Sequence, residues 1–404
     1  MNLKNLLKKK LPMLLSFLII FALFSEVNAK AFIANEPEQT LNVALYGYVP
    51  DPIRFKKAVE SEWNKKEPNI KLNFVDWDCY DEDPPENLDV FVFDAIYLSH
   101  FVNKGYLAEI SDKDIKNKED IIPFAMDGCT VNGVTYAIPQ IICTNLLFSR
   151  KGDIEIQKVN SVFNLYENIG DIKGDNINLP NNKGLLIDMS GGTTKVCMYL
   201  DSLIDTEKEY KQFYSLPNLN KLNGEAIKSL VLLQSMAGKN QANYWPENND
   251  AYIRSKWFMN GQGRAYIGYT EAMSTMKEFA NDVDFKTISL SKNSDIPVLY
   301  GDVIGVNSSI TNPAKKEKAM KLANIIADEN TMVKAVSSDE NNKYPQYLLP
   351  ARKSVYKDLE NKYPIYGKLY KIGNNPNNKL FRVGPEIRVW IKDAKKIIAE
   401  YLQQ

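Results

Sequence analysis

A regular alternation of predicted strands with predicted helices constrains the fold more than any other feature of the chain. Leu41 to Leu45 has the apolar character of a strand, residues 54–65 have the spacing of an amphipathic helix, and residues 71–75 and 88–93 have the pattern of two further strands. Strands that alternate with helices predict a parallel sheet covered by helices on both faces. The sequence therefore predicts an α/β fold.

In such a sheet, small molecules bind beyond the carboxyl ends of the strands. Residues that directly follow the predicted strands are therefore candidates for a binding site. These residues are Tyr46, Tyr48, Asp76, Trp77, Tyr80 and Asp94.

The N-terminus differs in character from the rest of the chain. Lys4 and the run Lys8 to Lys10 precede an apolar stretch that ends at Phe24, and small residues follow up to Ala29. This order is typical of a secretory signal peptide, and the stretch is shorter than the about 20 residues that a membrane-spanning helix needs. We expect removal of residues 1–29 near Ala29 and a secreted product with no membrane anchor.

The charge of the remaining chain argues against a nucleic-acid partner. The 50 lysines and arginines balance 50 acidic residues, and removal of the signal peptide lowers the formal net charge from +0 by three. Such a chain lacks the basic surface that nucleic-acid binding needs. Residues 30–404 are long enough for two hydrophobic cores, and we expect them to form a monomer.

Four cysteines are spread along the chain at positions that match no zinc-binding or CxxC pattern. They are Cys79, Cys129, Cys143 and Cys197. A chain of this length does not need disulfides to fold, so we expect free thiols, although two bridges stay open as the alternative for an exported protein.

Segments along the whole mature chain resemble extracytoplasmic solute-binding proteins. The resemblance is carried by residues 89–98 with 105–110, 136–150, 258–268, 312–316 and 349–352. It implies a two-lobed, periplasmic-binding-protein-like fold with three crossings and a ligand cleft between the lobes. The implied limits are 38–144 and 303–348 for lobe one, and 145–302 and 349–404 for lobe two.

Cys143 lies at the first of these expected crossings, in the segment from Ile141 to Asn145. A buried cysteine usually behaves as a small hydrophobic residue, and composition alone favours that interpretation. A partly exposed thiol beside polar groups can instead be a nucleophile. The position at the mouth of the expected cleft favours the second interpretation.

A nucleophilic cysteine needs a base, and the chain has one histidine. His100 follows Asp94 by one or two helical turns, where we expect it on the flank of a helix. A Cys-His-Asn triad and a multi-histidine zinc site are therefore both disfavoured. Glu271 follows the predicted strand 264–268 and should face the cleft from the second lobe, which makes it the candidate base.

Together these residues resemble the bacterial thiaminase I (thiamine pyridinylase) family. The resemblance is carried by Cys143 in Pro-Gln-Ile-Ile-Cys-Thr-Asn, Glu271 in Gly-Tyr-Thr-Glu-Ala, Asp94, and the segments 45–48, 77–80 and 300–302. It implies cleavage of thiamine between its pyrimidine methylene and its thiazolium nitrogen, with transfer of the pyrimidinylmethyl group to an amine, a pyridine or a thiol. Cys143 would add to the pyrimidine and Glu271 would be the base, with no metal or organic cofactor.

The same resemblance implies a cleft that suits a cation, because thiazolium carries a permanent positive charge that aromatic faces attract. The implied substrate-binding residues are Asp94, Asp302, Tyr46, Tyr48, Tyr80, Tyr269 and Tyr300, with Tyr252 and Trp77 as weaker candidates. Each tyrosine could instead serve in packing, since the chain has 22 of them.

The alternative function is a non-catalytic extracellular solute-binding protein for thiamine or a similar small molecule. Both functions predict closure on a ligand, so turnover of thiamine is the property that separates them.

Overall fold

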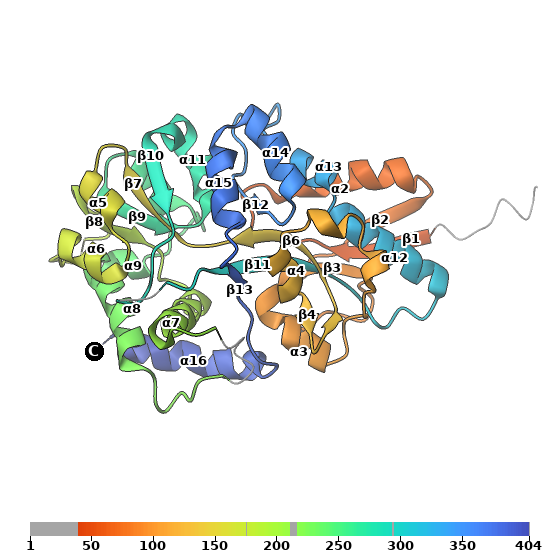
Figure 1. The fold of residues 1–404 in the computed structure, drawn as a ribbon, viewed down its shortest axis with the longest axis horizontal. Coiled ribbons are helices and arrows are strands. Elements are labelled where there is room, and N and C mark those ends of the chain that lie inside the picture. The colour runs from red at the N-terminus through yellow and green to blue at the C-terminus, as the bar shows by residue number, and fades with distance from the viewer. Residues whose placement is uncertain (1–38, 175, 211–215, 293–294, 404) are drawn as a thin grey trace, which may run out of the picture.

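The computed structural model describes residues 39–174, 176–210, 216–292 and 295–403. The expected signal peptide, residues 1–29, lies outside these ranges. Helices pack around two sheets that occupy opposite halves of the molecule (Figure 1). In the described ranges, no helix is long and apolar enough to cross a membrane.

The larger sheet has the strand order β12-β6-β11-β3-β1-β2, with β13 paired to β11. Its strands are β1 (Gln39–Ala44), β2 (Ile70–Phe74), β3 (Val90–Asp94), β6 (Ile138–Cys143), β11 (Val298–Val306), β12 (Leu349–Pro350) and β13 (Lys379–Leu380). β1 runs parallel to β2 and β3, whereas β11 runs antiparallel to β3 and β6. The sheet is therefore mixed rather than all parallel as predicted, and β11 joins its parallel part to the strand that ends at Cys143.

Helix α2 (Pro52–Lys66) shows how a helix of this half begins and which of its side chains it buries. The Asp51 side chain accepts the Arg54 N–H at 3.0 Å, and Pro52 supplies a backbone angle suited to the first turn. Phe55, Val59 and Trp63 recur every four residues and are buried. The other helices of this half are α3 (Leu98–Asn103), α4 (Pro123–Gly128), α12 (Pro313–Ile326), α13 (Glu329–Val336), α14 (Lys353–Lys362) and α15 (Ile365–Gly373).

The smaller sheet has the strand order β10-β7-β9-β8. Its strands are β7 (Leu146–Arg150), β8 (Asn181–Ile187), β9 (Gly263–Gly268) and β10 (Val283–Lys286), and only β8 and β9 are parallel. Its helices are α5 (Ile154–Lys158), α6 (Val162–Ile169), α7 (Gly192–Glu207), α8 (Gly224–Ala237), α9 (Lys239–Asn243), α10 (Ile253–Met259), α11 (Met273–Met276) and α16 (Ile387–Tyr401).

Short elements complete the fold. They are the hairpin β4 (Thr130–Val131) and β5 (Val134–Thr135), and the 3₁₀ turns η1 (Ala95–Tyr97), η2 (Asp112–Asp114), η3 (Lys118–Asp120), η4 (Thr270–Ala272) and η5 (Lys277–Asp282). Two of these turns matter for the site, because η1 directly follows β3 and η4 follows β9.

The chain passes between the two sheets at three places. It crosses from β6 to β7, returns from β10 to β11, and crosses again after α15 to reach α16, which packs on α7 (Figure 1). This arrangement confirms the predicted two-lobed α/β fold. The residue limits of the lobes stay a prediction: β11 spans the expected limit at 302/303, and β12 pairs with β6 although it follows the expected limit at 348/349.

Candidate active site

Cys143 is the last residue of β6 and lies at the first passage between the sheets. It pairs in register with Tyr300 of β11, and the next residue, Thr144, donates a hydrogen bond to the Val298 carbonyl at 3.4 Å. All four cysteines lie in the described ranges and are unpaired; Cys143 is partly exposed, whereas the other three are buried. Its thiol is thus the one that a bound molecule could reach.

The surroundings of Cys143 oppose formation of a thiolate in the absence of a ligand. Burial raises the pKa of the Cys143 thiol well above its ordinary value, and the charges of Asp302, Glu271 and Asp94 raise it further. The thiol is therefore protonated at neutral pH and needs a base to become a nucleophile.

Glu271 lies in η4, directly after β9 and Tyr269. Its side chain is 7 % exposed, and in the described ranges its Oε2 has no hydrogen-bond partner. Burial raises the pKa of Glu271 to about 7. A carboxyl group that changes charge near neutral pH is suited to take up and release a proton.

Asp94 and Asp302 are direct partners across β3 and β11, and both are buried. Asp94 is held in place because its Oδ1 accepts the Ile96 N–H at 2.9 Å and its Oδ2 accepts the Tyr80 hydroxyl at 2.6 Å. Burial raises the pKa of Asp302 well above its ordinary value, with further contributions from the charges of Asp94 and Glu271. Two close carboxyls in a buried site favour a cationic ligand, or a shared proton when none is bound.

Three tyrosines form a connected group beside Asp94. The Tyr80 hydroxyl that donates to Asp94 also lies 2.9 Å from the Tyr46 hydroxyl. The Tyr48 ring is 5.5 Å from each of these two rings, its hydroxyl donates to Asp78, and the residue is 58 % exposed. Tyr48 therefore marks the rim of the site.

A second aromatic group lies close to Cys143 and Glu271. The Tyr269 and Tyr300 rings meet edge to face at 6.3 Å, and the Tyr300 hydroxyl is buried with no partner in the described part of the chain. Burial raises the pKa of Tyr269, and the charge of Cys143 raises it further. Burial also raises the pKa of Tyr252, and the charge of Glu271 raises it further. The structure thus gathers all the predicted site residues except Trp77.

Trp77 belongs to the core. Its ring packs 5.4 Å from Phe91 and 6.2 Å from Phe101, and the residue is 9 % exposed. A strand-end position suggested a ligand contact, and the side chain packs against Phe91 of β3 and Phe101 of α3. Asp76, its neighbour, is exposed.

His100 is occupied by contacts away from Cys143. Its Nδ1 lies 3.1 Å from the Pro385 carbonyl oxygen and its Nε2 lies 3.0 Å from Asp83 Oδ1. Both ring nitrogens thus face acceptor oxygens, and the ring is not free to act as a base. In the described ranges, no group of three His, Cys, Asp or Glu side chains is arranged to hold a metal ion.

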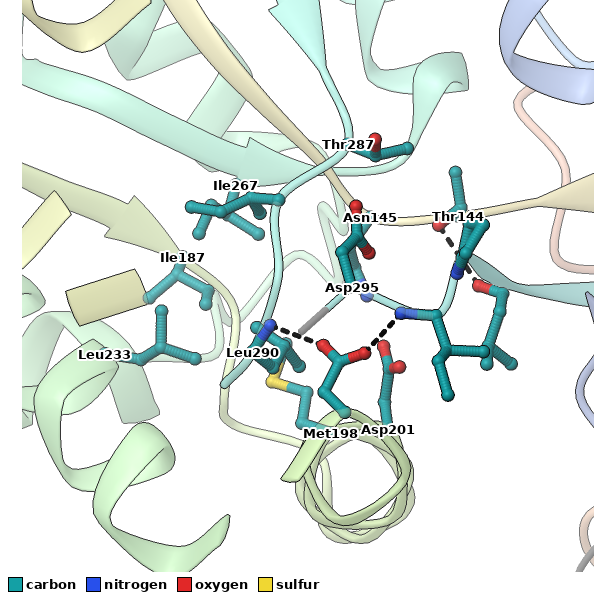
Figure 2. A pocket seen from close by; sticks show the side chains of 15 residues that line it. Thr144, Asn145, Ile187, Met198, Asp201, Leu233, Ile267, Thr287, Leu290 and Asp295 are labelled. Carbon is teal, nitrogen blue, oxygen red and sulfur yellow. Dashed lines mark hydrogen bonds between the residues drawn. The ribbon is translucent and has the colours of Figure 1, made fainter. Parts of the chain in front are cut away.

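Helix α7 supplies residues that the sequence did not indicate. Cys197 is one of the groups that raise the pKa of Cys143 after burial, and burial followed by the charge of Asp201 raises the pKa of Tyr300. Asp201 and Asp205 are four residues apart and therefore share a helix face, a spacing that could have identified them. Both line a cavity of about 30 Å³ that reaches Thr144 (Figure 2).

Asp205 connects this cavity to the second passage between the sheets. Its carboxylate accepts the Leu290 N–H at 2.8 Å and the Ile296 N–H at 2.7 Å, which fixes the segment that leads into β11 (Figure 2). The role of Asp205 is therefore to hold the backbone next to Tyr300 and Asp302.

Glu271→Gln is expected to stabilise the protein above pH 7. Because burial raises the pKa of Glu271 from 4.5 to about 7, the folded state favours the protonated group. That preference stabilises the fold fully below pH 4.5 and is lost as the pH rises through 7. Glutamine cannot ionise, so the unfolding free energy of the variant should exceed that of the wild type by about 3 kcal/mol at pH 8.

The measurement is urea unfolding of both proteins at pH 5 and pH 8. The stability difference should shrink to below about 1 kcal/mol at pH 5. An equal difference at both pH values would show that the carboxyl of Glu271 does not titrate in this range.

Comparison with known proteins identifies the family. Residues 144–291 match the family model described as the Thiaminase-1 domain. The protein Thiaminase-1 of Paenibacillus thiaminolyticus is 48% identical over 392 residues, which cover 97% of this chain and 95% of that protein.

Solved structures agree with this result. Thiaminase I of Clostridium botulinum in complex with thiamin is 80% identical, with a TM-score of 0.90 over 90% of this chain and 100% of that chain. Thiaminase I from Bacillus thiaminolyticus is 51% identical, with a TM-score of 0.88 over 90% of this chain and 99% of that chain. Maltose-bound MalE3 of T. maritima, at 18% identity and a TM-score of 0.62, covers 90% of this chain and 99% of its own and shares the fold alone.

These matches confirm both resemblances found in the sequence. The frame is that of the periplasmic solute-binding proteins, whereas the identity over nearly the full length is to thiaminases. This chain belongs to the thiaminase-1 family.

Proposed function

We propose that this protein cleaves thiamine and transfers its pyrimidinylmethyl group to an amine, a pyridine or a thiol. Membership of the family supports the proposal, and so does the related structure that was solved with thiamin. The observation that carries it is the pairing of a reachable thiol, Cys143, with a buried carboxyl that titrates near neutrality, Glu271.

The first step activates the substrate. The Glu271 carboxylate takes the proton of the Cys143 thiol, and the thiolate adds to C6 of the pyrimidine ring, forming a carbon–sulfur bond. The added electron pair makes the ring electron-rich. This step converts a ring that is a poor electrophile into one that can expel a leaving group from its methylene.

The next steps exchange the group on the methylene. The bond from the methylene to the thiazolium nitrogen breaks, and the nitrogen keeps the electron pair and leaves as neutral thiazole. Glu271 releases to solvent the proton that it took from Cys143 and is a carboxylate again. The co-substrate then attacks the exocyclic methylene, and an amine or a thiol gives its proton to Glu271, whereas pyridine has none to give. Loss of the Cys143 thiolate from C6 restores the aromatic ring and frees the protein.

The acidic and aromatic residues would bind and orient the substrate. We assign to Asp94 and Asp302 the hydrogen bonds from the aminopyrimidine and the negative charge that faces thiazolium. The aromatic faces add about 0.5–2 kcal/mol each where water is excluded. The residues with this role are Tyr46, Tyr80, Tyr252, Tyr269 and Tyr300, with Tyr48 at the exposed rim.

The proposal extends to the working state of the protein. We propose that it is secreted after cleavage near Ala29 and acts as a monomer, with no metal or organic cofactor. The lysine-rich, apolar N-terminus supports secretion. We also propose the lobes 38–144 with 303–348 and 145–302 with 349–404, which would close on the substrate.

Release of free thiazole is the test of the proposed function. Purified protein that lacks residues 1–29 is mixed with thiamine and either aniline or pyridine, and the products are separated by chromatography. We expect thiazole and the pyrimidinylmethyl adduct of the added nucleophile in equal amounts. Recovery of all the thiamine intact, with binding seen by calorimetry, would instead support a solute-binding protein.

A further inference from the structure

Arg388 links the last helix of the chain to the part of the site that holds Asp94. It is the second residue of α16, which packs on α7 beside the smaller sheet. The N-terminal end of the same helix reaches η1, which follows β3 in the larger sheet, because Arg388 contacts the Tyr97 ring. Arg388 therefore lies where the helix beside the smaller sheet meets the half of the molecule that contains the larger sheet.

Three contacts join Arg388 to one loop. Its Nη1 donates to the Tyr80 carbonyl at 3.2 Å and its Nη2 donates to the Glu82 carbonyl at 3.2 Å. Its Nη2 also lies 3.0 Å from Asp83 Oδ1. A planar, forked cation can satisfy these acceptors together, whereas a lysine ammonium cannot.

The guanidinium also supports Tyr80 from behind its ring. It lies 4.3 Å from the centre of the Tyr97 ring, and the Tyr97 ring meets the Tyr80 ring edge to face at 5.8 Å. Tyr80 is thus fixed through its backbone and through its ring. Its hydroxyl, which donates to Asp94 at 2.6 Å, is held in place by both.

Asp83 anchors the same region from the other side. Besides Arg388, it is contacted by His100 Nε2 at 3.0 Å and by the Tyr106 hydroxyl at 3.2 Å. His100 in turn contacts the Pro385 carbonyl, three residues before Arg388. The loop and the start of α16 are therefore fastened at several points.

We propose that Arg388 is a positioning residue for the substrate, an inference that rests on the proposed function. It holds Tyr80, and through Tyr80 the Asp94 carboxylate, in the orientation that receives the aminopyrimidine. Of the contacts in the described ranges, none joins Arg388 to Cys143 or Glu271. Arg388 therefore governs substrate binding rather than the making and breaking of bonds.

The test compares Arg388→Met and Arg388→Lys with a matched control, Arg264→Met. Arg264 also pairs with carboxylates, those of Asp153 and Glu155, and its side chain is 24% exposed against 20% for Arg388. We expect Arg388→Met to raise KM for thiamine about tenfold with kcat changed less than about threefold, because hydrogen bonds from a charged group are lost. The KM of Arg388→Lys should lie between those of the wild type and Arg388→Met, and Arg264→Met should keep the wild-type KM.

A second comparison separates positioning from general destabilisation. In the Tyr80→Phe background the hydroxyl that Arg388 positions is gone, so Arg388→Met should raise KM by less than about twofold further. The proposal would be overturned if Arg388→Met raised KM by the same factor in the Tyr80→Phe background as in the wild type. An unchanged KM in both Arg388→Met and Arg388→Lys would also overturn it. If Arg388→Met does not fold by circular dichroism, Arg388→Lys decides by the same comparison.

The test of Arg388 can be decided independently of the test of the proposed function. Thiamine affinities of the same variants, measured by calorimetry in the Cys143→Ser background, give the comparison without turnover. A wild type that binds thiamine without cleaving it would refute the proposed function and leave the affinity comparison decisive for Arg388. Failure to bind thiamine at all would overturn both.

Discussion

Cys143→Ser is expected to lower thiamine cleavage by at least about 10⁴-fold, because a serine hydroxyl beside these carboxyls cannot become the nucleophile that the thiol becomes. Binding should change little, since the change replaces one atom and leaves Asp94, Asp302 and the tyrosines in place. The measurement pairs thiazole release with calorimetric titration of thiamine. Cleavage near the wild-type rate would refute the role of Cys143.

Cys129→Ala is the matched control for this experiment. Cys129 is buried, and after burial the charge that acts on the pKa of its thiol is that of Arg382 rather than of the site carboxylates. The control should keep the wild-type rate and lose stability at most. Cys79 and Cys197 are also expected to be dispensable for the chemistry, although both lie nearer the site.

Glu271→Gln is expected to reduce kcat by about 10²–10⁴-fold, the usual contribution of a general base. The pH profile gives the sharper result. Because burial raises the pKa of Glu271 to about 7, the carboxylate that acts as base forms as the pH rises through 7. The wild-type rate should therefore climb across this range and level off above it.

Glu271→Gln should lack this rise in rate near pH 7 and should gain activity only at higher pH, where Cys143 ionises without a base. The pKa of Cys143 lies well above its ordinary value because of burial, so this rise should begin late. A full rate with the same limb in Glu271→Gln would require another base. His100 would be the first to test, although both its ring nitrogens face acceptors.

The sequence predicted the parts of the site that depend on one strand and its end. Asp94 is the last residue of the apolar strand β3, and its place at the sheet edge follows from that pattern. Cys143 was expected at the first crossing because of the resemblance to solute-binding proteins, and Glu271 was expected after the predicted strand 264–268; they lie at the end of β6 and in η4, after β9. Local pattern locates Asp94 and Glu271 in the sequence because the end of a strand determines which edge of the sheet the next residues occupy.

Other features required the register between distant strands. Asp302 lies inside the buried strand β11, and only the antiparallel pairing with β3 brings it opposite Asp94. The rotation of α7 that brings Cys197 and Asp201 near the site is set by packing between helices and sheet. Trp77 was predicted as a weaker ligand contact; its ring packs against Phe91 and Phe101, and this contact depends on how α3 and the sheet pack.

The contacts of Arg388 show the same limit most clearly. Residues 80 and 388 are 308 positions apart, and no spacing in the sequence relates them. The link exists because the chain crosses between the lobes a third time and sets α16 against η1. Such long-range contacts become visible only in the folded chain.

The central claim is that cleavage proceeds through a covalent bond between Cys143 and the pyrimidine. Mass spectrometry of the intact protein, quenched in acid after mixing with thiamine and no added nucleophile, tests it most directly. The account predicts one pyrimidinylmethyl group per chain, located on the peptide that contains Cys143 and absent from Cys143→Ser. Release of one thiazole per chain with the protein mass unchanged would contradict it, because the methylene would then have been attacked directly.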